Sequence, residues 1–157
     1  MTHRVLFVCL GNICRSPLAE AAFRVEAARI GLNAEADSAG TGDWHRGEPP
    51  DRRAIAAARR HGVDISDLRA RQVQPEDFER FDHIIALDGE NLADLRAIRL
   101  EGSRARLSLL LDHVPGREGE AVADPYYGDD SDFGITWRDV TAGARALADA
   151  LAREEAA

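Results

Sequence analysis

The sequence has no apolar run long enough to cross a membrane, which requires about 20 residues. Its first apolar run, residues 5–10, is also too short for a signal peptide and lacks the usual flanking residues. The sequence therefore predicts no membrane partner and no export by means of a signal peptide. We expect the protein to be cytoplasmic.

Lysine is absent, and all 20 basic residues are arginine. The formal net charge is −8, which argues against a nucleic-acid partner because a polyanion would be repelled. Since arginine is so common in this chain, a functional arginine has to be identified by its place in a motif.

Only two cysteines are present, Cys9 and Cys14. A zinc site built by protein alone usually takes four ligands, and the C-x4-C spacing is poor for metal binding. We therefore expect no metal and no other cofactor. In a cytoplasmic chain both thiols should be reduced, and a reversible bond between them under oxidising conditions stays an open alternative.

Predicted strands alternate with predicted helices along the chain. Apolar runs predict strands at residues 5–8, 34–39, 83–87 and 107–111. Periodic or capped segments predict helices at residues 16–30, 51–61, 75–81, 88–100 and 135–153. This alternation predicts a single α/β domain over residues 1–157, with a four-stranded parallel sheet and helices on both faces.

The active sites of such sheets lie beyond the carboxyl ends of the strands. Cys9, Ser38 and Asp88 all fall at predicted strand ends, and a long acidic loop, residues 115–132, follows the last strand. We therefore expect these four parts of the chain to share one crevice.

The stretch from Cys9 to Arg15 joins the first strand to the first helix. We expect Ser16 to cap that helix and Pro17 to occupy its first position. The loop N–H groups and the positive helix end would then converge on one anion, together with the Arg15 guanidinium, which can hold two phosphate oxygens. The same positive field favours the Cys9 thiolate. The pattern predicts a phosphate-binding loop with a nucleophilic sulfur.

A second motif lies in the acidic loop, at Asp124-Pro125-Tyr126-Tyr127-Gly128. When a phosphoryl group passes to a thiolate, the leaving oxygen needs a proton, and a positioned carboxylic acid contributes ~10²–10⁴-fold in rate. The proline stiffens the chain beside Asp124, and the two tyrosines offer an apolar wall. Alone, an Asp-Pro step indicates only a turn, but beside the cysteine loop it predicts a general acid.

The segment Cys9-Leu10-Gly11-Asn12-Ile13-Cys14-Arg15-Ser16-Pro17, taken with residues 124–128, resembles the low-molecular-weight protein tyrosine phosphatases. The resemblance implies hydrolysis of phosphotyrosine, and of small aryl phosphates, through a phosphocysteine intermediate. It makes Cys9 the nucleophile, Arg15 the ligand of the phosphoryl oxygens, and Asp124 the general acid and then the general base. It also implies that Ser16 donates a hydrogen bond to the Cys9 sulfur.

The same resemblance assigns the other site residues. It implies phosphate or substrate binding by Leu10, Gly11, Asn12, Ile13, Cys14, Ser16, Trp44, Tyr126 and Tyr127. It implies loop support by Ser38, acting through Asn12, and by Asp88, which also suits a helix cap. One residue departs from the family pattern: many relatives have a hydrogen-bonding histidine where this chain has Leu68.

Three other functions stay open at this point. An arsenate reductase on the same fold would need further cysteines downstream of Cys14, and none follows. A non-catalytic phosphate-binding module would not need Asp124. A phosphoarginine phosphatase is disfavoured by Ile13, because the family pattern for that substrate has threonine there. The expected partners are phosphotyrosine proteins and phosphate-like anions, and we expect a monomer or weak dimer.

Overall fold

The chain folds around a four-stranded, all-parallel sheet, as seen in a computed structural model that describes residues 1–157. The sheet order is β2-β1-β3-β4, and the strands are β1 (His3–Cys9), β2 (Ala34–Gly40), β3 (His83–Ala86) and β4 (Arg106–Leu109). The helices are α1 (Arg15–Arg29), α2 (Arg52–Arg59), α3 (Asp77–Arg80), α4 (Gly89–Ile98) and α5 (Asp130–Ala156), with a 3₁₀ turn η1 (Leu110–His113). The predicted single α/β domain is confirmed.

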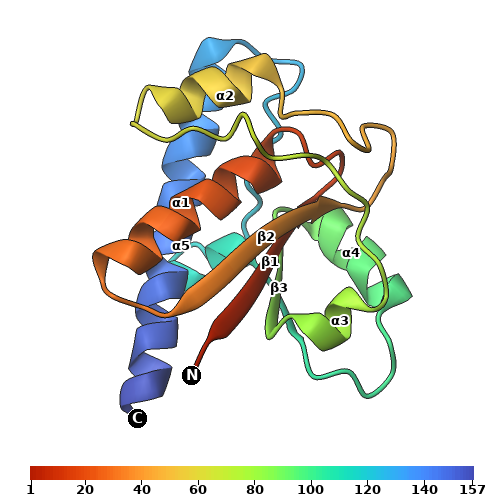
Figure 1. The fold of residues 1–157 in the computed structure, drawn as a ribbon, viewed down its shortest axis with the longest axis vertical. Helices are drawn as coiled ribbons and strands as arrows, with labels where there is room; N and C mark the ends of the chain where they lie inside the picture. Colours follow the sequence, from red (N-terminus) through yellow and green to blue (C-terminus); the bar gives the residue numbers. More distant parts are fainter.

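Helices cover both faces of the sheet: α1 and α5 lie on one side, and α3 and α4 lie on the other (Figure 1). The central strand β1 explains this layering, because successive side chains of a strand point to opposite faces. Val5 and Phe7 pack into the larger apolar core, which holds α1 and α5. Leu6 and Val8 pack into the smaller core, which holds α3 and α4. A strand buried on both faces needs a nearly continuous apolar run.

Helix α1 begins one residue earlier than predicted, and Ser16 does not cap it. The N-cap residue is Cys14, and the helix starts at Arg15. Ser16 is the second helical residue, with its hydroxyl 3.0 Å from the Cys9 sulfur. The prediction was wrong because this hydroxyl has a partner outside the helix. Pro17 is the third residue of the helix and not the first. Its missing N–H still costs little, because the first four N–H groups of a helix have no intrahelical acceptor.

Helix α5 begins at Asp130, five residues earlier than predicted. The Asp129 carboxylate accepts from the backbone N–H groups of Ser131 and Asp132, and this hydrogen-bonded cap starts the helix within the acidic segment. Strand β4 ends at Leu109, before the predicted end, because η1 follows it directly. Neither α5, with its 27 residues, nor any other helix is apolar enough to cross a membrane.

Candidate active site

The loop of residues 9–15 runs from the carboxyl end of β1 to the first residue of α1. No side chain caps α1, and no acidic residue lies in its first turn. The first N–H groups of the helix therefore lack an intrahelical acceptor and carry the positive end of the helix dipole. This end of α1 is suited to bind an anion such as phosphate.

Asn12 fixes the shape of this loop. It has a backbone φ of 60°, a left-handed conformation that asparagine tolerates better than most residues. Its buried amide nitrogen donates to the hydroxyls of Ser16 at 2.8 Å and Ser38 at 3.0 Å. Its amide oxygen accepts from the backbone N–H of Arg71 at 3.0 Å. One side chain thus ties the loop to α1, to β2 and to the segment before α3.

The end of β2 packs directly against the backbone of the loop. A Cβ atom at Gly40 would lie 2.7 Å from the carbonyl oxygen of Leu10 and 3.2 Å from the nitrogen of Asn12. Glycine is therefore required here for close approach. The next residue, Thr41, donates its N–H to the carbonyl oxygen of Cys9 at 2.9 Å. Strand β2 supports the loop from beneath.

Below Asn12 the hydrogen bonds continue to a buried carboxylate. Ser38 donates to Glu20 at 2.7 Å, and Arg24 lies 2.7 Å from the other oxygen of Glu20. Burial raises the pKa of Glu20. The hydrogen bond from Ser38 and the charge of Arg24 lower that pKa, but they offset only part of the rise. Leu68 packs against the apolar core. The loop is thus supported by a serine, a glutamate and a backbone N–H, without the family histidine.

The Arg15 guanidinium is almost fully buried and points along one wall of the site. It donates to Asp88 at 2.7 Å and to the carbonyl oxygen of Val122 at 3.0 Å, and its other terminal nitrogen lies 3.6 Å from Asp124. Burial lowers the pKa of Arg15, but the negative charges of Cys9, Asp88 and Asp124 outweigh burial and raise it. Arg15 therefore stays charged. Asp88 also caps α4, where its other carboxylate oxygen accepts from the N–H of Asn91.

The two cysteines have different surroundings. The Cys9 sulfur lies beside the Ser16 hydroxyl and lines the pocket. Cys14 packs into the larger apolar core, although it also borders the pocket. Burial, followed by the negative charge of Asp51, raises the pKa of the Cys14 thiol. Of the two sulfurs, Cys9 is the one placed for nucleophilic attack.

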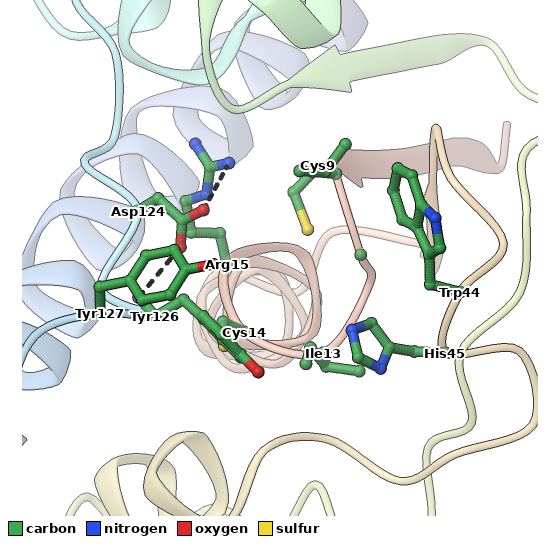
Figure 2. Close-up of a pocket in the computed structure, with 11 residues that line it drawn as sticks. Cys9, Ile13, Cys14, Arg15, Trp44, His45, Asp124, Tyr126 and Tyr127 are labelled. Carbon is green, nitrogen blue, oxygen red and sulfur yellow. Dashed lines mark hydrogen bonds and ion pairs between the residues drawn. The ribbon is translucent and has the colours of Figure 1, made fainter.

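Asp124 lies beside the Arg15 guanidinium, on the side of the pocket across from Cys9 (Figure 2). One of its oxygens accepts from the N–H of Tyr126 at 3.1 Å, and the other forms the ion pair with Arg15. The side chain is 47% exposed, so it can reach a group bound in the pocket. The structure brings this carboxylate to the same pocket as the sulfur.

Arg53, at the start of α2, holds the segment that carries Asp124. It donates to the carbonyl oxygens of Tyr126 at 2.9 Å and Gly128 at 3.1 Å. Its guanidinium lies 4.6 Å from the centre of the Phe133 ring and is paired with Asp51. These contacts fix the position of the part of the acidic loop that carries Asp124.

The pocket between these walls has a volume of about 230 Å³. Trp44 and Tyr127 form an exposed rim, 69% and 97% accessible, and Tyr126 packs edge-on against Tyr127. The full lining comprises Cys9, Leu10, Gly11, Ile13, Cys14, Arg15, Trp44, His45, Asp124, Tyr126 and Tyr127. Asn12, Ser16, Ser38 and Asp88 are placed behind this lining as supports.

The sequence assigned no site role to His45, Arg53 or Glu20. His45 lines the pocket and pairs with Glu48 at 2.6 Å. Its place beside Trp44 is the one signal that pointed to it. No signal marked Arg53, in a chain with 20 arginines, or Glu20, within an apolar helix.

The parallel sheet and the loop between β1 and α1 define an α/β protein with a phosphate-binding loop. The family model described as low molecular weight phosphotyrosine protein phosphatase matches residues 4–157. The low molecular weight protein-tyrosine-phosphatase of Streptomyces coelicolor is 50% identical over 133 residues, which cover 82% of this chain and 80% of that one. This chain belongs to the low molecular weight phosphotyrosine protein phosphatase family.

Solved structures agree with this assignment. A protein tyrosine phosphatase from Entamoeba histolytica has a TM-score of 0.91 and 32% identity, with 98% of this chain and 99% of that chain covered. A Drosophila arginine phosphatase has a TM-score of 0.87 and 30% identity, with 94% and 96% covered. The fold is thus shared by proteins described as acting on different phosphorylated residues.

We predict that replacing Asn12 weakens anion binding. Asn12→Gly keeps the left-handed backbone accessible but leaves the groups around it without partners, at a cost of about 1–3 kcal/mol. Isothermal titration with inorganic phosphate should show affinity reduced by about tenfold or more. Asn12→Ala, which adds backbone strain of about 1–2 kcal/mol, should also lower the urea midpoint further.

The matched control is Asn33→Ala, an exposed asparagine that hydrogen-bonds only to Thr2 through its side chain. It should leave phosphate affinity unchanged. Wild-type affinity in the Asn12→Gly protein would show that the amide does not set the shape of the loop.

Proposed function

We propose that this protein tyrosine phosphatase hydrolyses phosphotyrosine in proteins, and small aryl phosphates, through a phosphocysteine intermediate. The observation that carries the proposal is the meeting of three groups in one pocket: the Cys9 sulfur, the Arg15 guanidinium and the Asp124 carboxylate. The free N–H groups at the start of α1 complete the phosphate site.

In the first step the Cys9 thiolate attacks phosphorus, a sulfur–phosphorus bond forms, and the bond to the phenolic oxygen breaks. Arg15 and the loop N–H groups hold the non-bridging oxygens and stabilise the charge that develops on them. Asp124 gives its proton to the departing oxygen, so that a neutral phenol leaves. The 3.6 Å contact with Arg15 places the carboxylate near the bound group.

In the second step the Asp124 carboxylate takes a proton from water, and the water oxygen attacks phosphorus. The sulfur–phosphorus bond breaks, inorganic phosphate is released, and the Cys9 thiolate is restored. The Ser16 hydroxyl, 3.0 Å from the sulfur, stabilises that thiolate as it departs. Atoms and protons therefore balance with water as the only co-reactant.

The walls of the pocket favour a phenyl ring as the leaving group. Ile13 and the aromatic side chains of Trp44 and Tyr126 border the space beside Cys9. Flat apolar walls stack well on a phenyl ring. An arsenate reductase relay is disfavoured because no cysteine follows Cys14. Phosphoarginine is the remaining rival, given the resemblance to the Drosophila enzyme.

We predict that a phosphotyrosine peptide is turned over faster than a phosphoarginine peptide of the same sequence. Phosphate release should be measured under reducing conditions, with and without orthovanadate, which should inhibit. Cys9→Ser should abolish turnover yet still bind the phosphotyrosine peptide in a titration. Faster phosphoarginine turnover, or full activity of Cys9→Ser, would contradict the proposal.

We predict that Asp124→Asn slows the transfer to Cys9 by ~10²-fold or more when the leaving group is a poor one. An amide cannot supply the proton, so phenyl phosphate should lose more kcat/KM than p-nitrophenyl phosphate, whose phenolate leaves readily. The measurement is kcat/KM across a series of aryl phosphates of graded leaving-group pKa. An equal loss for all of them would assign the acid to another group.

We predict that Arg53→Leu also slows the transfer to Cys9, but by less than Asp124→Asn. The substitution removes the hydrogen bonds from Arg53 to the acidic loop. A misplaced acid costs about tenfold or more, so kcat/KM for phenyl phosphate should fall while p-nitrophenyl phosphate falls less. Arg52→Leu is the matched control, since Arg52 is exposed and carries the same charge. Identical profiles for the two variants would remove Arg53 from acid positioning.

A further inference from the structure

A second groove lies beside the catalytic pocket, bounded by residues 41–44, residues 72–75 and helix α4. Its volume is about 430 Å³. The lining comprises Leu10, Thr41, Gly42, Trp44, Gln72, Val73, Gln74, Pro75, Asp94, Ala97 and Ile98. The three side chains assigned to phosphate transfer, Cys9, Arg15 and Asp124, are not among them.

The groove and the catalytic pocket share two wall residues, Leu10 and Trp44. Trp44 lies on the opposite side of Cys9 from Asp124 and Tyr127 (Figure 2). Its ring packs directly on Gly42, where an added Cβ would lie 1.9 Å from the indole. The indole thus lies between the two hollows, which adjoin each other on this side of the catalytic pocket.

The chemistry of the groove selects a long side chain with a charged end. Leu10, Trp44 and Ile98 expose 44%, 69% and 37% of their surface, which gives apolar walls for an aliphatic stem. Asp94 is the one charged residue in the lining, is exposed, and takes part in none of the protein's ion pairs. Arginine and lysine combine an aliphatic stem with a cation, and a cation also binds favourably over an indole.

We propose that this groove binds an arginine or lysine side chain that flanks the phosphotyrosine in a protein substrate, with its cation at Asp94. The proposal rests on the proposed function, because the phosphotyrosine is what anchors the peptide next to the groove. An extended chain advances at most about 3.3–3.6 Å per residue. Because the groove and the catalytic pocket share the wall residues Leu10 and Trp44, we place the basic residue within two positions of the phosphotyrosine.

The test uses phosphotyrosine peptides that carry arginine, norleucine, alanine or glutamate at each position from −2 to +2. The readout is kcat/KM, divided for each enzyme variant by its value for p-nitrophenyl phosphate, which has no flanking residue. At one or two positions, arginine should exceed alanine by about threefold to tenfold in the wild-type enzyme. Norleucine should fall between them, because it supplies the stem without the charge.

Asp94→Asn should remove the advantage of arginine over norleucine and leave that of norleucine over alanine. Glu101→Gln is the matched control, since it removes one exposed charge just beyond α4 that does not line the groove. It should keep the arginine preference. An arginine preference that is absent in the wild type, survives Asp94→Asn, or is lost equally in Glu101→Gln would overturn the proposal.

Failure of the proposed function would look different. In that case no aryl phosphate or phosphotyrosine peptide would be turned over at all. Turnover of every peptide at one common rate would instead leave the phosphatase assignment intact and reject only the groove as a binding site for basic side chains.

Discussion

The buried amide of Asn12 is the contact on which the geometry of the site depends. It joins Ser16, Ser38 and the backbone of Arg71, which belong to three separate parts of the chain. A buried polar group left without a partner costs about 1–3 kcal/mol. Other conformations of the loop, which would leave some of these groups without hydrogen bonds, are therefore less stable. The hydrogen bonds of that network offset the free-energy cost of the left-handed backbone conformation at Asn12. They also fix the direction of the loop N–H groups before an anion binds.

The same constraint sets the electrostatics above the loop. A phosphate monoester brings negative charge to a site that already holds Cys9 and Asp124, so the positive groups must be fixed. Asp88 and the carbonyl oxygen of Val122 hold one terminal nitrogen of Arg15, which leaves the other near Asp124 and the pocket. The helix dipole of α1 adds a second positive source that cannot turn away. The charge balance is therefore set by backbone and buried side chains.

The sequence was most informative for the unit formed by β1, the loop of residues 9–15 and α1, because this unit contains both the central strand of the sheet and the reactive cysteine. The apolar run of β1 predicted a strand buried on both faces, and the position of Cys9 at its end predicted the site. The start of α1 was misplaced because the Ser16 hydroxyl has a tertiary partner that no local pattern reveals. For the same reason the role of Arg53 was not predictable from its neighbours, because the carbonyl oxygens of Tyr126 and Gly128 that it binds lie more than 70 residues away.

Phosphotyrosine presents the same ring and the same phosphoryl group in every substrate, so the groups that perform the chemistry cannot distinguish one phosphoprotein from another. Discrimination has to come from contacts beyond the catalytic pocket. Trp44 borders both hollows, so under the two proposals above a change there would alter ring binding and peptide binding together. Of the two hollows, helix α4 lines only the groove, through Asp94, Ala97 and Ile98. Substrate preference can therefore change through α4 while the loop held by Asn12, and with it the chemistry, stays the same.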